Sequence, residues 1–218
     1  MAKKWMITGV AASIGAGAMA LSAMAETLAY PADGFDEIDV SAGLSVVFER
    51  ADTHSVTAEF ERGGPEDVVV DVKGDTLVIK RKQSGWSWGG DKVKATFTVT
   101  APNLTAIEAS SGSSFSGSGV DAETFEIDVS SGSSVRVSGR CGAIDVDLSS
   151  GASVNAADLS CEDAVLDASS GASLSLAVSE SISVDASSGA SINVTGSPEV
   201  RDLDRSSGAS VNIRPGAL

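Results

Sequence analysis

The chain contains few of the residues on which many enzymes depend. It has one histidine and two cysteines, and aromatic residues make up 5% of its 218 positions. The histidine lies in the polar segment Asp52-Thr53-His54, and no serine stands in the sharp-turn motif that presents the nucleophile of many hydrolases. A Ser-His-Asp triad needs a histidine beside an activated serine. The sequence therefore indicates no catalytic residue, and we expect a protein that is not an enzyme.

Positive charge is also scarce. Fifteen Lys and Arg residues stand against 30 Asp and Glu residues, which gives a net charge of −15 at pH 7. Binding to nucleic acids and to anionic lipids depends on basic side chains that displace counterions. Because an acidic surface repels both, we expect no nucleic-acid partner.

The first 25 residues have the organisation of an export signal. Lys3 and Lys4 precede a moderately apolar stretch at 5–21, and Ala23-Met24-Ala25 follows it. A membrane anchor is the alternative, because the stretch approaches the ~20 residues that a span needs, but glycines dilute it and no basic cluster follows. We expect residues 1–25 to be a removed signal peptide and the mature chain to have no transmembrane span. The protein would then be exported to the periplasm, the outer membrane or the cell surface.

A short motif recurs six times in the second half of the chain, as Ser-Ser-Gly-Ser-Ser twice and as Ser-Ser-Gly-Ala-Ser four times. A repeat of about 20 residues is typical of a solenoid, in which each coil buries its apolar face by stacking on its neighbours. A flexible Gly/Ser linker is the alternative, but a linker does not keep apolar residues in phase over six repeats. The central glycines, spaced by 18 to 20 residues, are Gly112, Gly132, Gly151, Gly171, Gly189 and Gly208.

Apolar and polar residues alternate on both sides of each central glycine. With the glycine as position zero, positions −5, −3, +3 and +5 are mostly apolar, and positions −4, −2, +2 and +4 are mostly polar. A period of two predicts strands with one buried face, and a glycine in every unit excludes helix. We therefore expect an all-β fold, a parallel β-helix (β-solenoid) with coils of about 19–20 residues, regular over residues 102–218.

The serine at −1 and the small residue at +1 are expected to point into the coil, at a corner where glycine relaxes the backbone. Stacked corners would place the −1 serines in one column whose hydroxyls donate hydrogen bonds from coil to coil. These serines are Ser111, Ser131, Ser150, Ser170, Ser188 and Ser207.

The two cysteines provide an independent test of the stacking. Cys141 lies nine residues after Gly132, and Cys161 lies ten residues after Gly151, so both have nearly the same phase in adjacent coils. Neighbouring coils are ~4.8 Å apart, which suits the Cα separation of a disulfide. Metal ligation and a redox pair are weaker alternatives, because no histidine or third cysteine is near. We expect a Cys141–Cys161 disulfide, in keeping with an exported chain.

Residues 26–101 have no Ser-Ser-Gly corner but still contain short strand patterns separated by turns. A solenoid needs a cap over its first apolar coil, so these residues, in the same domain, are expected to form either irregular coils or a small capping sheet. The expected strands are 35–40, 44–48, 56–60, 68–72, 77–80 and 93–100.

One column of the repeat is acidic in all six units. At the spacing of stacked strands, adjacent carboxylates repel each other by ~1 kcal/mol in water. Hydrogen bonds from the −2 serine hydroxyls or from corner amides would offset this repulsion, and a strip of bound Ca²⁺ is the alternative. We expect no other cofactor and no specific metal ligand. The column at −4 is Glu108, Asp128, Asp147, Asp167, Asp185 and Asp204.

The segment Gln83–Asp91 is a second candidate for binding. Its two tryptophans, Trp86 and Trp88, alternate in a glycine-rich stretch and could form a platform for a sugar ring or a partner protein. The alternative is a lid over the end of the apolar core.

The segments Gly34–Gly43, Phe97–Leu104 and Gly196–Pro198, with the serial Ser-Ser-Gly corners, resemble the auto-transporter adhesin family with a head GIN domain. The members are exported bacterial β-solenoid proteins. The resemblance covers nearly all of the mature chain and implies a right-handed parallel β-helix at the cell envelope, an adhesive role and no catalytic residues. The family's Gly-Ile-Asn element corresponds to Gly43-Leu44-Ser45, and because the asparagine is absent, no role of that side chain is carried over.

Two functions follow from these patterns, and assembly through exposed end coils is a third, limited by how well residues 212–218 and the N-terminal strands cap the ends. The first is a non-enzymatic envelope or cell-surface module with a binding or structural role, whose partner is an envelope protein or a glycan. The second is a carbohydrate-active β-helix enzyme that uses surface carboxylates. An enzyme should present a cleft with convergent carboxylates, whereas an adhesin should present a long flat face.

Overall fold

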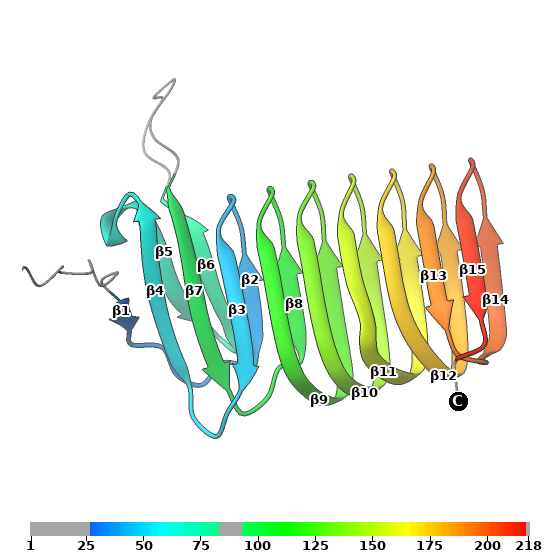
Figure 1. The fold of residues 1–218 in the computed structure, drawn as a ribbon, viewed down its shortest axis with the longest axis horizontal. Helices are drawn as coiled ribbons and strands as arrows, with labels where there is room; N and C mark the ends of the chain where they lie inside the picture. Colours follow the sequence, from blue (N-terminus) through cyan, green and yellow to red (C-terminus); the bar gives the residue numbers. More distant parts are fainter. Residues whose placement is uncertain (1–26, 83–92, 217–218) are drawn as a thin grey trace, which may run out of the picture.

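The computed structural model describes residues 27–82 and 93–216. These residues form a β-solenoid of stacked coils, with one short 3₁₀ helix, η1 (Pro65–Asp67), near the N-terminal end (Figure 1). The expected signal peptide, residues 1–25, and the two tryptophans, Trp86 and Trp88, lie outside the described residues. In the part of the chain that the structure describes, no helix has the length and apolar character that a membrane crossing requires.

The solenoid is flattened into two sheets. Each long strand crosses from one sheet to the other, so its first half pairs in the first sheet and its second half in the second sheet. Strands of successive coils are parallel and in register. The strands of the repeat are β8 (Ala106–Ala109), β9 (Ser114–Val129), β10 (Ser134–Leu148), β11 (Ser153–Ala168), β12 (Ser173–Ala186), β13 (Ser191–Thr195), β14 (Glu199–Arg205) and β15 (Ser210–Arg214).

The N-terminal strands close one end of the stack. In the first sheet the order runs β1-β4-β7-β3-β9, and in the second sheet it runs β5-β6-β2-β8. Pairing is antiparallel between β1 and β4, β4 and β7, and β5 and β6, whereas β2 and β3 join the parallel stack. All the strands expected here are present, and β1 is an additional one. Their bounds are β1 (Thr27–Tyr30), β2 (Glu37–Val40), β3 (Ser45–Arg50), β4 (Ser55–Arg62), β5 (Val68–Lys73), β6 (Thr76–Arg81) and β7 (Lys94–Ala101).

The Ser-Ser-Gly motif forms the tight turn at one edge of every coil. The amide of the +1 residue donates to the carbonyl of the −2 serine at 3.0–3.4 Å. The −1 serine and the glycine both have positive φ, at 49–57° and 71–81° respectively, as in type I′ turns. The amide of each central glycine from Gly112 to Gly189 also donates to the −1 carbonyl of the following coil, for example Gly112 to Ser131 at 3.1 Å. Main-chain bonds thus stitch one turn to the next.

The prediction that the −1 serines point inward is wrong. All six, from Ser111 to Ser207, are exposed at the tip of the turn. Two consecutive residues with positive φ interrupt the alternation of the strand. Only the +1 residue points inward, as predicted for that position, and Ser113, Ser133 and Ala152 are buried there. The buried hydroxyls are satisfied locally, since Ser133 Oγ accepts hydrogen bonds from the amides of Gly112 and Ser113 at 3.1 and 3.2 Å.

The apolar columns form a continuous core between the two sheets. At position −5, Ile107, Ile127 and Val146 are no more than 1% exposed, and the +3 column is equally buried as far as Ile192. Both columns open to solvent in the last coil, where Leu203 is 38% exposed. The reason is that, within residues 27–82 and 93–216, β14 pairs with β12 alone and β15 pairs with β13 alone.

The opposite edge of each coil is a bend that carries the chain between the sheets. A Cβ atom on Gly139 would lie 2.1 Å from the carbonyl oxygen of Val120 in the coil below, so no larger residue fits there. Cys141 and Cys161 are direct neighbours on β10 and β11, with their Cα atoms 4.6 Å apart and a disulfide between them. The predicted disulfide is thereby confirmed, together with the stacking on which it depended.

Candidate functional site

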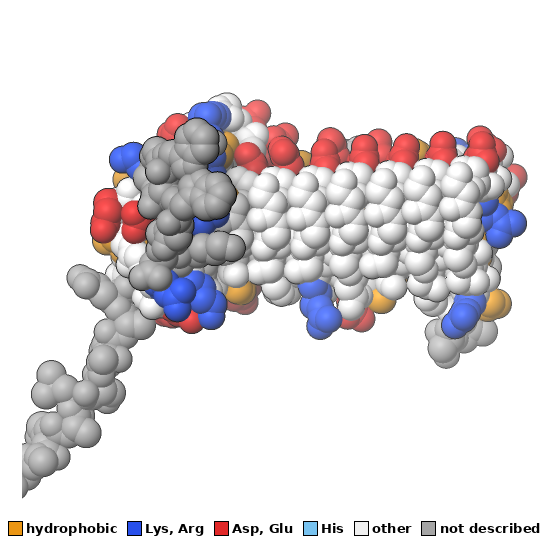
Figure 2. Space-filling model, turned by 90° about the horizontal axis from the view of Figure 1, so that it is seen from above, with side chains coloured by type: hydrophobic (Ala, Val, Ile, Leu, Met, Phe, Trp, Pro, Cys, Tyr) orange, Lys and Arg blue, Asp and Glu red, His pale blue; other side chains and the backbone are white. Residues whose placement is uncertain are grey.

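The acidic column forms an unbroken ladder on the outer face of the second sheet. Each carboxylate pairs in register with the next, and Asp39 of β2, which the sequence pattern did not assign to the column, pairs with Glu108. Asp39 is half-buried and the other six side chains are exposed. Figure 2 shows acidic side chains in a row along one side of the turns. We call this set the acidic ladder: Asp39, Glu108, Asp128, Asp147, Asp167, Asp185 and Asp204.

The stacking perturbs the ionisation of the acidic ladder. Partial burial raises the pKa of Glu108, and the neighbouring carboxylates Asp39 and Asp128 raise it further. The pKa of Asp147 is raised for the same two reasons, here by burial and by the charges of Asp128 and Asp145. These shifts mean that ionisation of Glu108 and Asp147 costs free energy that isolated carboxylates would not require.

Within residues 27–82 and 93–216, the ladder carboxylates have no hydrogen bond from a −2 serine and no ion pair. The hydroxyl bonds expected to offset the repulsion are therefore not formed. In the same described part of the chain, no three acidic, His or Cys side chains converge as a metal-binding group. The carboxylates lie in a line, one per coil, and do not face each other across a cleft.

The outer face of the first sheet carries a column of uncharged hydroxyl groups, in contrast to the carboxylates of the acidic ladder. Its +2 column is serine in every coil, with Ser114 Oγ donating to Ser45 Oγ at 2.9 Å and Ser173 Oγ to Ser153 Oγ at 3.1 Å. Asn193 and Asn212 follow in the +4 column, and their amide groups are 3.4 Å apart. We call this face the hydroxyl face. Its serine column is Ser45, Ser114, Ser134, Ser153, Ser173, Ser191 and Ser210.

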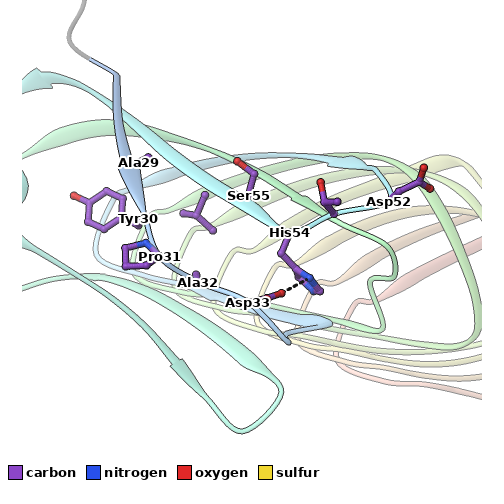
Figure 3. Close-up of a pocket in the computed structure, with 10 residues that line it drawn as sticks. Ala29, Tyr30, Pro31, Ala32, Asp33, Asp52, His54 and Ser55 are labelled. Atoms are coloured by element: carbon purple, nitrogen blue, oxygen red, sulfur yellow. Dashed lines mark ion pairs between the residues drawn. The ribbon is translucent and has the colours of Figure 1, made fainter.

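A hollow of about 710 Å³ lies beside β1 and contains the single histidine (Figure 3). The side chain of His54 is 19% exposed, with Nδ1 2.8 Å from Asp33 Oδ1 and Nε2 2.8 Å from the carbonyl oxygen of Phe35. Both ring nitrogens therefore face acceptors, and neither is left for the hydroxyl of Ser55, which lines the same hollow. The arrangement does not suit general-base activation of a serine.

The family described as "Putative auto-transporter adhesin, head GIN domain" matches residues 34–198. The chain belongs to this family. The family resemblance noted in the sequence is thus confirmed, and the match ends just before β14 begins.

Several solved structures share the fold of this head GIN chain. A putative adhesin from Bacteroides fragilis is 18% identical, with a TM-score of 0.66, over 88% of this chain and 98% of that chain. Putative adhesins from Parabacteroides distasonis and Parabacteroides merdae are each 13% identical, with TM-scores of 0.54 and 0.52. The former comparison covers 86% of this chain and 96% of that chain, and the latter covers 87% and 95%. Among curated proteins, no match is found.

The head GIN element of this chain forms a turn of the same kind as the Ser-Ser-Gly turns. Ala42 and Gly43 both have positive φ, at 65° and 76°, and Leu44 is fully buried. Ser45, which occupies the place of the family's asparagine, begins the serine column by accepting a hydrogen bond from Ser114. In this chain the element therefore starts the hydroxyl face.

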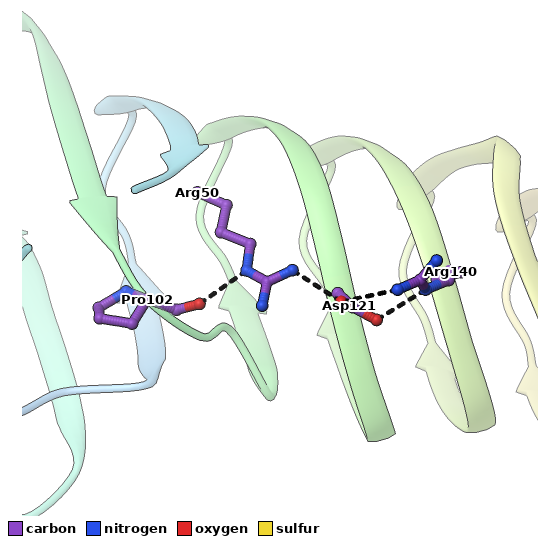
Figure 4. Close-up of polar contacts among 4 residues, drawn as sticks. All are labelled: Arg50, Pro102, Asp121 and Arg140. Atoms are coloured by element: carbon purple, nitrogen blue, oxygen red, sulfur yellow. Dashed lines mark hydrogen bonds and ion pairs between the residues drawn. The ribbon is translucent and has the colours of Figure 1, made fainter. Parts of the chain in front are cut away.

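A charged cluster that the sequence did not reveal links three coils at the bend edge (Figure 4). Asp121 accepts hydrogen bonds from Arg140 at 2.8 and 3.0 Å and from Arg50 at 2.7 Å, and Arg50 Nε donates to the carbonyl of Pro102. The bonds from Arg140 and Arg50 lower the pKa of Asp121 to about 2. Each charge of this cluster has a partner, so its role is structural.

Proposed function

We propose that this chain is an exported, non-enzymatic, adhesin-like module of the cell envelope, and that it binds its partner through the acidic ladder. The partner is a surface with repeated positive charge, either a basic envelope protein or a glycan that carries amino groups. Calcium ions that bridge the ladder to an anionic partner are the second possibility for the same face.

The observation that carries this proposal is the register of seven carboxylates at one strand spacing, without a bonded partner among the described residues. Alignment of like charges costs free energy, and a cationic ligand that spans several coils would recover this cost on binding. Membership of a family described as adhesins agrees with a binding role. A flat row of carboxylates offers no pair across a scissile bond, as a glycosidase would need.

The direct test is binding of the purified chain to an immobilised basic protein and to an immobilised polymer of amino sugars, measured at several salt concentrations. The variant D128N/D147N/D167N neutralises the middle of the ladder. We expect it to bind at least about tenfold more weakly, with a shallower dependence on salt.

The matched control is E49Q/E59Q/D158N, which removes the same charge from exposed positions outside the ladder. It should bind as the wild type does. Equal weakening by both variants would mean that net charge alone governs binding and would refute the ladder as a site. Binding only with added CaCl₂ and an anionic partner would replace the cationic partner by the calcium-bridged one.

Export is tested separately. Mass spectrometry of the protein recovered from the cell envelope should give a chain that begins at Glu26. Recovery of the chain with residues 1–25 still attached from the cytosolic fraction would contradict this part of the proposal.

A further inference from the structure

The C-terminal coil differs from the others because, among the described strands, each of its two strands has a neighbour on one side only. All seven residues of β14 are exposed, and β15 alternates between exposed and half-buried residues. The inward-facing Leu203 continues the column of Val184, which is 4% exposed, and Val200 continues that of Ile182, which is fully buried. The last coil thus presents a free hydrogen-bonding edge on each sheet and an apolar strip between them.

The charges on this coil are balanced, in contrast to the rest of the protein. Its two strands carry three arginines and three carboxylates, whereas the whole chain has a net charge of −15. Figure 2 shows basic side chains gathered at this end of the stack. The charged residues are Glu199, Arg201, Asp202, Asp204, Arg205 and Arg214.

Arg205 narrows the choice of partner. It occupies the −3 position and stands in register with the buried Ala186, where an apolar residue would otherwise face inward. A purely apolar strand placed against this edge would leave the guanidinium without a partner, which is unfavourable. The occupant must therefore supply strand edges, apolar side chains and a carboxylate near Arg205.

We propose that the occupant is the same coil of a second copy, so that two solenoids join end to end at their C-terminal coils. In an antiparallel pairing of β14 with its copy, Val200 and Leu203 of the two strands cover one another, and the two arginines of each strand lie among the three carboxylates of the other. An isologous contact of this kind is self-complementary and closes after two copies. The neutral coil is also the place where two acidic chains approach with the least repulsion.

The test is the molar mass of the purified chain across a range of concentrations, measured by sedimentation. We expect a reversible monomer–dimer equilibrium, and V200D should raise the dimer dissociation constant by at least about tenfold. The matched control is V165D, since Val165 is 55% exposed on an outer face and Val200 is 45% exposed on the end coil. The control should change the dissociation constant by less than about twofold.

Amide hydrogen exchange then locates the contact and guards against an unfolded variant. The amides of β14 and β15 should be protected at high protein concentration and exposed at low concentration, while those of β9–β12 do not change. A monomer at all concentrations would overturn the proposal. Open-ended growth would overturn it too and would indicate head-to-tail docking, and protection of β14 only after addition of an envelope extract would assign the edge to a different protein.

Discussion

The acidic ladder and the hydroxyl face are built on one backbone register yet differ completely in charge. On both faces, identical side chains stack at the spacing of parallel strands. Serines in such a column bond to each other, as Ser114 does with Ser45, whereas carboxylates in the same arrangement repel. The core requires only that outward positions be polar, so it does not explain why one face is acidic in every coil. Folding therefore requires polar residues at these positions but does not require them to be acidic.

The largest effect on both faces is expected from a substitution in the bend that joins the two sheets. We expect G139A to lower the free energy of unfolding by about 3 kcal/mol or more, because its Cβ would lie 2.1 Å from the carbonyl oxygen of Val120. The control is G132A, where the new Cβ meets nothing within 4 Å and only the positive φ of 71° opposes it. Its cost should be about 1 kcal/mol in chemical denaturation. Equal losses would mean that the bend is not tightly packed.

Removal of the disulfide tests how firmly the two coils that carry it hold both faces in register. The variant C141A/C161A should lose about 3 kcal/mol, because the bond closes a loop with a sequence separation of 20. Thermal unfolding with and without a reductant measures the same effect on the wild type. A melting temperature that does not respond to the reductant would show that the register holds without the bond.

Carboxylates placed in the serine column of the hydroxyl face test whether stacked charges alone account for the difference between the two faces. The variant S153D/S173D replaces two bonded hydroxyls on adjacent coils by two carboxylates and should cost about 1 kcal/mol at low salt. The matched control S153N/S173N keeps the polarity without the charge. The cost of the aspartates should decrease as NaCl is added, and a loss that is independent of salt would argue against charge repulsion.

The smallest effect is expected when one charge is removed from the acidic ladder, which lowers the repulsion between its carboxylates. D147N should stabilise the protein by about 0.5 kcal/mol at neutral pH, because it removes repulsion from Asp128 and Asp145. D158N, in the bend and outside the ladder, is the control and should be neutral. A destabilised D147N would mean that Asp147 has a favourable interaction that its charge provides.

The dependence of stability on pH follows from the same shifts. Since the pKa of Glu108 and of Asp147 is raised in the folded state, the folded protein holds these protons more tightly than the unfolded chain does. Their contribution to stability therefore falls as the pH rises through the range just above the ordinary carboxyl pKa, and it returns on acidification. Asp121 acts in the opposite direction, because its lowered pKa, about 2, gives stability that is lost as the pH falls toward that value. Urea titrations between pH 4 and 7 give the free energy of unfolding as a function of pH. It should decrease less steeply with rising pH in D147N than in the wild type.

The sequence was sufficient to predict features that repeat with the coil. The apolar columns, the acidic column and the Cys141–Cys161 bond follow once like residues are placed one strand spacing apart. The orientation of the −1 serines could not be read in this way, because it depends on positive φ at two residues of the turn. The inward and outward alternation of side chains predicts their orientation within a strand but not in the turns between strands.

Contacts between coils that are distant in the sequence were also beyond prediction. Asp39 belongs to the acidic ladder because β2 lies between β6 and β8, an order that differs from the order along the chain. Arg50 and Asp121 are 71 residues apart and meet only because β3 stacks on β9. In both cases the residue types were visible, but no local signal fixed their positions.

The disulfide has a mechanical consequence. A solenoid pulled from its C-terminal end peels away one coil at a time, since each coil is held mainly by its neighbours. Peeling would proceed through β15 and β14 and onward until it reaches β11, where the covalent link to β10 withholds the 20-residue loop from extension. The force then passes through the disulfide to Cys141 on β10, so the coils beyond this point can extend only after the chain has bypassed the loop.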